Sequence, residues 1–301
     1  MKRKRSPDAP PPAVTADTPV ETAPLFEPLA RELVALLRRL QPRDWLLPTS
    51  AGAWTVRDVA AHLLDGDLRR ISAERDGHAA PPPAGGIPDG VALLAFLDDL
   101  NADWVTVSRR LSTAVIADLL EWSGPIVAHL MVESDPLGPA LFPVAWARRP
   151  DSPRWLDTGR EYTERWHHQD QIREAVGAPP LDDPAWLRPA IDVSLAAVPP
   201  VYAHLAAPAG TTVVLEAGGA AGAVWSIVSE GGGWRVTIGD TPTADCRIRT
   251  SALLLVRLLL HRLPADAIFA GFEVTGDAAL GEPLLNARAV MVPTPARPAT
   301  T

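Results

Sequence analysis

Apolar residues recur at helical spacing through the first 180 residues of the chain. The first amphipathic stretch begins near Pro24, and Pro42 should end it, because proline cannot continue a helix interior. Its expected buried stripe comprises Leu29, Leu33, Leu36, Leu37 and Leu40. We therefore expect an amphipathic first helix that packs one face against other elements.

A second helix has a clear start signal. Thr55 is expected to be its N-cap, and Asp58, three positions later, resembles the acidic partner of a capping box. The helix should end near Gly77, before a loop over residues 78–90 that is rich in proline and glycine. Its expected apolar stripe comprises Val56, Val59, Ala60, Leu63 and Ile71.

Later segments continue the helical pattern with one interruption. We expect helices over residues 91–111 and 157–176, with a short helical turn over 118–121. Prolines interrupt residues 125–153, which should form an irregular excursion. The expected buried face of the helix over 91–111 comprises Leu93, Leu94, Leu97, Leu100, Trp104 and Val107. The pattern predicts an antiparallel helical bundle over residues 25–180.

The second part of the chain changes character after a further helix over residues 184–206. Short segments rich in β-branched residues, separated by glycine-rich turns, predict a meander of hairpins. The expected strands are residues 211–216, 223–228, 234–238, 244–248 and 272–275. Thr250 should cap a leucine-rich helix over 251–262, and a last helix is expected over 277–290. Residues 184–290 thus read as a small α+β domain.

Composition narrows the function classes. The net charge of −8 argues against a general nucleic-acid binder, and Cys246, the single cysteine, excludes an internal disulfide and fits a reducing cytoplasm. The longest apolar run, residues 251–263, is too short to span a membrane, so no membrane segment is expected. Residues 1–24, which are rich in proline, and 291–301 are expected to be a disordered tail and a loose tail.

Two helices carry the polar residues that could hold a metal ion. Glu164 and His168 are spaced i, i+4, and Gln171 follows on the same helix face. His62, at the edge of the second helix's apolar stripe, could complete a set of two imidazoles and one carboxylate. Three such ligands suit a zinc ion with an open fourth position, although iron, nickel or cobalt would accept them too.

Other interpretations of these residues stay open. Glu164 and His168 also form an ordinary helix-surface pair, His62 could be a buried structural histidine, and His167 could compete as a ligand. Gln171 could support a metal ligand or be a plain surface residue. Three tryptophans could line a pocket or belong to the core: Trp54, Trp146 and Trp166. The remaining histidines have no acidic partner at helical spacing: His78, His129, His204 and His261.

Two segments resemble a known family. Residues 54–67 (WTVRDVAAHLLDGD) and 160–173 (REYTERWHHQDQIR), with its Glu-x-Trp-x-His core, are similar to the signature of the DinB-like, mycothiol-dependent maleylpyruvate isomerase superfamily. The resemblance implies a four-helix bundle in which His62, Glu164 and His168 hold a divalent metal. It favours His168 over His167, because of the spacing from the tryptophan. No arginine here can be matched to the family's catalytic arginine; Arg69, Arg70 and Arg75 lie near the end of the second helix.

The second part of the chain also resembles this family. Residues 243–248 (TADCRI), the leucine-rich helix and residues 274–277 (VTGD) look like the sterol-carrier-like domain that often follows such a bundle. The likeness covers roughly residues 25–290. It implies two domains, a metal-binding bundle over 25–180 and a sterol-carrier-like domain over 184–290.

The leading hypothesis is a cytoplasmic, metal-dependent enzyme that activates a low-molecular-weight thiol, mycothiol. A metal ion promotes deprotonation of a coordinating thiol, and the thiolate can add to an electrophilic double bond. Addition, rotation and elimination would isomerise a maleylpyruvate-like cis alkene, whereas net consumption of the thiol would make the protein an S-transferase. The alternative is a non-catalytic protein whose bundle is structural and whose second domain holds a lipid or another small molecule.

Overall fold

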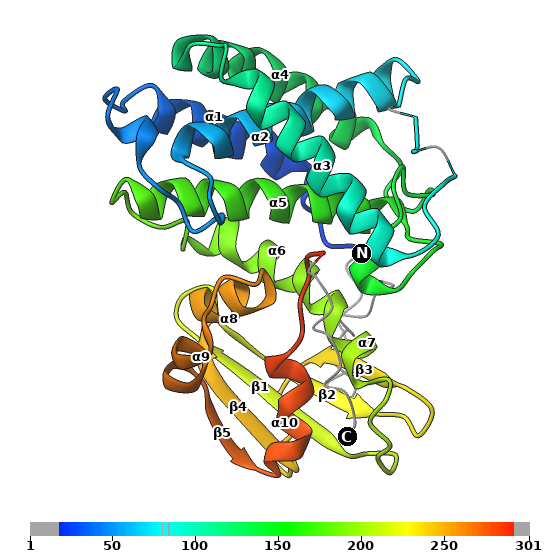
Figure 1. Cartoon of the computed structure of the whole chain (residues 1–301). Helices are drawn as coiled ribbons and strands as arrows, with labels where there is room; N and C mark the ends of the chain where they lie inside the picture. Colours follow the sequence, from blue (N-terminus) through cyan, green and yellow to red (C-terminus); the bar gives the residue numbers. More distant parts are fainter. Residues whose placement is uncertain (1–17, 80, 84, 292–301) are drawn as a thin grey trace, which may run out of the picture. The chain divides into compact units, whose positions relative to one another are not determined.

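The computed structural model describes residues 18–79, 81–83 and 85–291. Within this part of the chain two compact units separate, a helical unit over Val20–Leu181 and a unit with a β-sheet over Asp182–Ala289 (Figure 1). Most of the two expected tails, residues 1–17 and 292–301, lies outside the described residues. As expected, the first part of the chain is helical, and the second part combines helices with a β-sheet.

The helical unit contains five α-helices and short 3-10 or π segments within its described residues. In chain order these are η1 (Ala23–Leu25), α1 (Phe26–Leu37), η2 (Asp44–Leu46), α2 (Val56–Arg70), η3 (Ile71–Arg75), α3 (Gly90–Ser108), α4 (Thr113–Glu133), η4 (Ala145–Ala147) and α5 (Arg154–Ala175). Helices α1, α2, α4 and α5 pack on one another, and α3 packs on α2. The core between them includes Leu33, Leu36, Val59, Leu64 and Ile116.

The start of α2 is set by local chemistry, as expected. The Thr55 side chain accepts a hydrogen bond from the Asp58 backbone N–H, and the Asp58 carboxylate accepts one from the Thr55 backbone. This capping box satisfies backbone donors that a helix start would leave unpaired. The helix was expected to end near Gly77; its α-helical part ends at Arg70, and the π-helical turn η3 continues it to Arg75.

Helix α4 corrects the expectation of a short turn followed by an irregular segment. It begins at the N-cap Ser112 and runs through Pro125 to Glu133. A proline inside a helix costs about 3 kcal/mol or more. Burial of several side chains on α4 offsets that cost, among them Ile116, Ala117, Leu120, Val127 and Met131.

Helix α4 also corrects the expectation that no segment is long and apolar enough to cross a membrane. Among the described residues one helix, Thr113–Glu133, meets that test by length and composition, and 44% of its apolar window is buried. Because this helix packs against α1 and α2, we interpret it as a core helix of the bundle.

The contact between α4 and α1 depends on Gly124. A Cβ atom added at Gly124 would lie 2.9 Å from the Cβ of Ala30, whereas one added at Gly66 in α2 would meet nothing within 4 Å. Gly124→Ala should therefore lower the free energy of unfolding by about 1–3 kcal/mol through overpacking. Gly66→Ala should raise it by about 0.5–1 kcal/mol through helix propensity. Urea unfolding of both variants checks this prediction, and two shifts of the same sign would contradict it.

Helix α3 is more exposed than its apolar sequence led us to expect. Within its span only Val105 and Ser108 are fully buried, whereas Val107 is half exposed and Val91 lies largely in solvent. Trp104 is half-buried and donates its indole N–H to the Ala61 carbonyl of α2 at 2.8 Å. The predicted buried face of α3 was therefore too large, because α3 packs on the outer side of α2 and does not enter the core.

The sheet unit holds five strands and five α-helices within its described residues. They are α6 (Pro184–Ser194), η5 (Leu195–Ala197), α7 (Val198–Tyr202), β1 (Thr212–Gly218), β2 (Ala223–Ser229), β3 (Trp234–Ile238), β4 (Cys246–Ser251), α8 (Ala252–Leu259), α9 (Ala265–Gly271), β5 (Glu273–Gly276) and α10 (Ala278–Leu285). The strand order is β3-β2-β1-β4-β5 (Figure 1). The core lies where Val213, Leu215, Trp225, Ile227 and Ile248 are fully buried.

The strand positions were expected to within a few residues, but the topology was expected only in part. Strands β1, β2 and β3 form the antiparallel meander, whereas β4 pairs in parallel with β1, so that Val213 lies opposite Cys246. Helix α8 is capped by Ser251 and not by Thr250. Helix α9 was not anticipated, and the helix expected over 184–206 is broken into α6, η5 and α7.

Candidate metal centre

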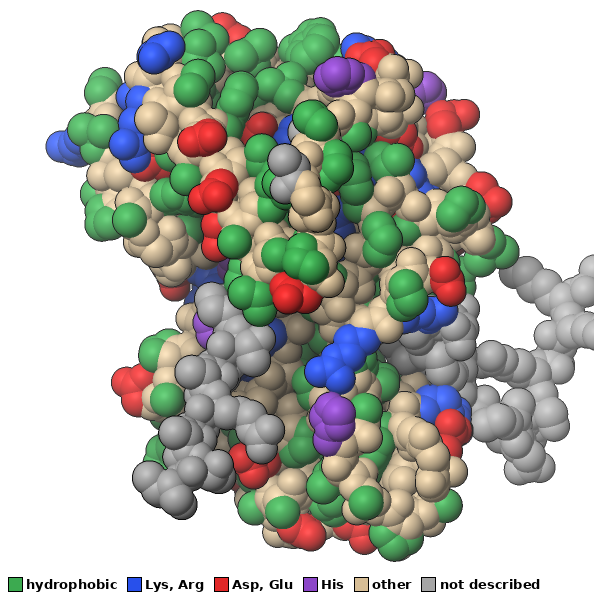
Figure 2. Space-filling model, turned by 45° about the vertical axis from the view of Figure 1, so that its right-hand side comes forward, with side chains coloured by type: hydrophobic (Ala, Val, Ile, Leu, Met, Phe, Trp, Pro, Cys, Tyr) green, Lys and Arg blue, Asp and Glu red, His purple; other side chains and the backbone are tan. Residues whose placement is uncertain are grey.

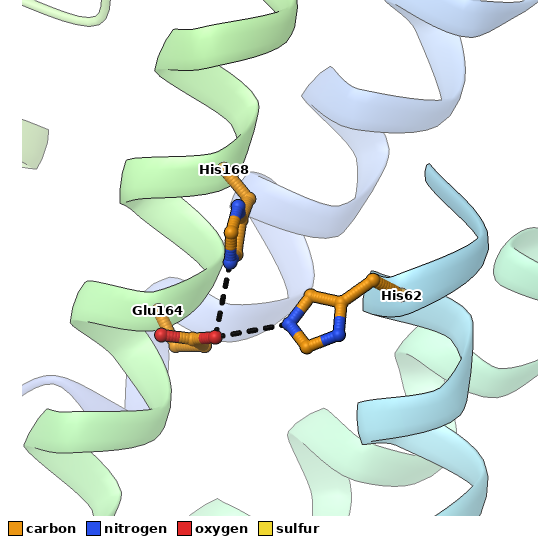
Figure 3. A group of neighbouring side chains, drawn as sticks. All are labelled: His62, Glu164 and His168. Atoms are coloured by element: carbon orange, nitrogen blue, oxygen red, sulfur yellow. Dashed lines mark hydrogen bonds and ion pairs between the residues drawn. The ribbon is translucent and has the colours of Figure 1, made fainter. Parts of the chain in front are cut away.

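Helices α2 and α5 bring three potential metal ligands together. His62 lies on α2, and Glu164 and His168 lie one turn apart on α5 (Figure 3). The Nε2 atoms of both histidines lie 3.1 Å from the same carboxylate oxygen, Oε1 of Glu164. One ligand atom from each of the three residues lies within 4.8 Å of the others. The side chains therefore converge on one point; helical spacing predicted this for Glu164 and His168, and the approach of His62 was a hypothesis.

The cluster is enclosed on several sides and open on one. The side chains of His62 and His168 are only 9% and 10% exposed, whereas that of Glu164 is 38% exposed. The ring of Trp54 covers the imidazoles, with its centroid 5.0 Å from that of His62 and 6.4 Å from that of His168. Solvent therefore reaches the cluster from the side of Glu164.

Gln171 determines which nitrogen of His168 faces the cluster. The Nδ1 atom of His168 lies 2.7 Å from Oε1 of Gln171, an oxygen that can only accept a hydrogen bond. Nδ1 must therefore carry a proton, and in neutral His168 the Nε2 lone pair points at the Glu164 carboxylate. Two acceptors 3.1 Å apart need a proton or a cation between them. A metal ion satisfies this arrangement, and such support is typical of metal-bound histidines.

The charges of the cluster also suit a cation. Burial opposes the charged form of Glu164, but the charges that His168 and His62 carry when protonated, and the hydrogen bonds they then donate, outweigh it and hold the pKa of the carboxyl well below its usual value. Burial lowers the pKa of His62, although the hydrogen bond to Glu164 works in the opposite direction. At neutral pH the protein thus offers a carboxylate and a neutral imidazole, which are the ligand forms that bind a divalent metal.

His62 differs from His168 in its support. Its Nδ1 atom is buried and has no hydrogen-bond partner among the residues that the structure describes. Its position depends instead on the packing of α2, whose neighbouring residues Ala61 and Leu63 are buried. Any effect of the supporting glutamine should therefore act through His168 alone.

Replacing Gln171 with alanine should weaken Zn²⁺ binding by about 10- to 100-fold, because the His168 ring loses the acceptor that orients it. Gln171→Glu retains an acceptor oxygen at that position and should keep most of the affinity. Competition titration with a metal-sensitive dye measures both constants. Equal Zn²⁺ affinity of the alanine variant and the wild-type protein would contradict a supporting role for Gln171.

A chain of ion pairs runs through the bundle beside the cluster, and sequence reasoning did not find it. Asp157, whose side chain is fully buried, pairs with Arg70 at 2.9 Å and with Arg160 at 2.8 Å. Arg160 also pairs with Glu161, which in turn pairs with Arg165. The residues of a single pair lie up to 98 positions apart in the sequence, as for Arg165 and Asp67. The sequence offered one signal only: Arg160 lies four residues before Glu164, which places both on the same helix face.

Other singled-out residues lie outside the ligand group. His167 contacts the ring of His168, with centroids 5.0 Å apart, but is not a member of the cluster. Trp166 is fully buried in the core. Arg75 is exposed, and Arg69 pairs with Asp65. Four histidines are exposed, as expected of surface residues: His78, His129, His204 and His261. Cys246 is buried on β4, and Trp146 is half-buried in η4.

Comparison with known proteins gives a likeness of fold. No protein-family model and no curated protein sequence matches this chain. Among solved structures, a mycothiol-dependent maleylpyruvate isomerase aligns with a TM-score of 0.51 at 13% identity, over 86% of this chain and 94% of the other. A histidine-to-alanine mutant of mycothiol-dependent maleylpyruvate isomerase aligns with a TM-score of 0.50 at the same identity and coverage. The chain therefore has a fold similar to that of this isomerase.

Proposed function

We propose that this protein is a metal-dependent enzyme that activates a low-molecular-weight thiol, with mycothiol as the cosubstrate. The observation that carries the proposal is the convergence of His62 Nε2, Glu164 Oε1 and His168 Nε2 on one point. The similarity of fold to mycothiol-dependent maleylpyruvate isomerase supports it. The bundle would then be a DinB-like metal-binding domain over residues 25–180, followed by a sterol-carrier-like domain over 184–290.

The residues present fit a divalent cation, with zinc as the first candidate. Two neutral imidazoles and one carboxylate match the donor set of catalytic zinc sites, which keep one position open. A metal ion held there would lower the pKa of a thiol that enters this position, from about 8.5 for a free cysteine-like thiol. Zinc is favoured over iron, nickel and cobalt only by this chemistry.

The chain's own residues would orient and shield the reactants. Gln171 holds the His168 ring in the tautomer that presents Nε2, and Trp54 screens the imidazoles from water. The thiol and an electrophilic substrate would approach from the exposed side of Glu164. A thiolate that adds to a cis alkene conjugated to a carbonyl forms a C–S bond, and the π electrons move onto the carbonyl. Rotation about the new single bond and loss of the same thiolate then give the trans alkene and regenerate the thiol.

The test is an isomerisation assay with purified full-length protein. Zinc-loaded protein with mycothiol should convert maleylpyruvate to its trans isomer, followed by absorbance, and should do so neither without thiol nor with the His168→Ala variant. Formation of a stable thiol adduct in place of the trans isomer would assign the protein as an S-transferase. Absence of both products with every thiol tested would overturn the proposal.

The proposed partners are the thiol and a small electrophile, and the proposed location is the cytoplasm. On the face shown in Figure 2, acidic and basic side chains are interspersed. An extended basic face, which general nucleic-acid binding would require, is not seen among the described residues of that view. That nucleic acid is not a partner stays a prediction.

A second candidate function is non-catalytic binding of an apolar ligand by the sheet unit. A hollow of about 450 Å³ there is lined entirely by apolar residues: Ala265, Ile268, Phe269, Phe272, Val274 and Leu285. Phe269 is 90% exposed, which is unusual for a phenylalanine. Native mass spectrometry of the purified protein separates the two functions. A bound lipid with no metal would support the carrier, and one metal per chain with no lipid would support the enzyme.

A further inference from the structure

Helix α5 is open to solvent at one place only within its central span. From Arg154 to Arg173 every residue is buried except four charged residues, which are half-buried: Arg160, Glu161, Glu164 and Arg165. The side chains of Arg160 and Glu164 are 27% and 38% exposed, whereas those of the other two are 12% exposed. The opening that exposes the candidate ligand Glu164 therefore exposes Arg160 as well.

Arg160 is anchored through one nitrogen of its guanidinium group, and the other two nitrogens are unpaired within the described part of the chain. Its Nη2 atom donates to Asp157 at 2.8 Å and to Glu161 at 2.7 Å. Its Nε and Nη1 donors make no hydrogen bond to any residue that the structure describes, and neither atom is both buried and unpaired. The fully buried Asp157, itself paired with Arg70, anchors the guanidinium. The free donors are therefore presented at the opening by a preorganised side chain.

The position of Arg160 relative to the metal cluster follows from the helix. Residues four apart lie on the same face, with Cβ atoms about 5–6 Å apart, so Arg160 lies one turn from Glu164. Burial opposes the charge on Arg160, but Glu161, Asp157 and Glu164 outweigh it and keep the pKa of the guanidinium above its usual value. A fixed guanidinium with two donor atoms, Nε and Nη1, that are unpaired among the described residues thus lies beside the open side of the cluster.

We propose that Arg160 is a specificity-determining residue that binds a carboxylate group of the substrate. The inference rests on the proposed function, because it places the electrophilic carbon at the metal-activated thiol and the carboxylate at Arg160. Guanidinium donors form charge-assisted hydrogen bonds with carboxylates and phosphates, and the conjugated electrophile of the proposed function carries a carboxylate. The spacing of one helical turn suits a compact molecule in which the double bond and a carboxylate are a few bonds apart. The maleylpyruvate-like substrate of the proposed function has this arrangement.

The test measures binding of two probes to the full-length protein by calorimetry, with and without Zn²⁺. The probes are maleate, a cis-alkene dicarboxylate, and its uncharged diamide. Arg160→Gln should weaken maleate binding by about 10- to 100-fold. It should leave the diamide and Zn²⁺ affinities unchanged. Arg75→Gln, at an exposed arginine on η3, is the matched control and should bind maleate like the wild-type protein.

Arg160→Lys keeps the positive charge but loses the planar guanidinium group, so it should weaken maleate binding less than Arg160→Gln does. If the glutamine variant does not fold, the lysine variant decides the question by the same comparison with wild type. Equal maleate affinity in the wild-type protein and the variants, or no maleate binding at all, overturns the proposal for Arg160. Failure of the proposed function would show separately, as a wild-type protein that binds no Zn²⁺. If the wild-type protein binds maleate without a metal and the Arg160 variants do not, the result would still support Arg160 as the carboxylate-binding residue.

Discussion

Replacing His168 with alanine is expected to weaken Zn²⁺ binding by more than about 100-fold, beyond the effect of losing a residue that only supports a ligand. The substitution removes one of three converging donor atoms and leaves Glu164 and His62 as the remaining candidate ligands of the group. Two ligands do not hold zinc in a defined tetrahedral site. The fold should persist, because α5 keeps its other buried side chains, among them Trp166 and Ile172.

The neighbouring histidine provides a matched control. His167 and His168 are both 8% exposed and adjacent on α5, but only His168 belongs to the ligand group. His167→Ala should therefore keep a Zn²⁺ affinity close to that of the wild-type protein. Calorimetric titration of both variants, with circular dichroism to confirm the fold, gives the comparison. Equal losses in the two variants would show that burial at this position, and not metal ligation, explains the effect.

Asp157→Asn should lower the free energy of unfolding by about 3–5 kcal/mol, the usual consequence of removing one partner of a buried ion pair. The Asp157 carboxylate is fully buried and accepts hydrogen bonds from Arg70, Arg160 and the Leu141 backbone. An amide cannot neutralise the two arginines, and its own N–H groups would face their donors. At about 2–4 °C per kcal/mol, the melting temperature should fall by about 6–20 °C.

An exposed ion pair provides the control for this prediction. Asp76 pairs with Arg75 at 2.7 Å, and both side chains are about half exposed. Exposed pairs contribute about 0–1 kcal/mol, so Asp76→Asn should leave the melting temperature nearly unchanged. Differential scanning calorimetry of the two variants measures both effects. A melting temperature for Asp157→Asn within a degree or two of that for Asp76→Asn would contradict the importance assigned to the buried chain of ion pairs.

Sequence reasoning succeeded where the relevant interactions are local. The capping box of Thr55 and Asp58 lies within four residues, and the spacing of Glu164 and His168 places both on one helix face. The choice of His168 over His167 came from the family resemblance, because helical spacing alone allowed either. The meeting of His62 with the other two was a hypothesis about how two helices face each other, and their atoms do lie together.

Sequence reasoning failed where tertiary contacts decide the structure. Pro125 was expected to prevent a helix, but close packing at Gly124 and burial along α4 stabilise one through it. The parallel pairing of β4 with β1 joins segments that are not neighbours in the chain. The buried ion pair of Arg70 was not predicted, because nothing in its local sequence identifies Asp157 as its partner 87 residues away.

The most direct test of the metal centre replaces zinc with a cobalt ion whose spectrum reports its ligands. We predict that the wild-type protein binds one Co²⁺ per chain with the absorption of a tetrahedral site, and that a low-molecular-weight thiol adds a thiolate-to-cobalt charge-transfer band. Neither signal should appear in His62→Ala, which removes the ligand supplied by α2. A wild-type protein that binds no cobalt, or that binds it equally well without His62, would contradict the account.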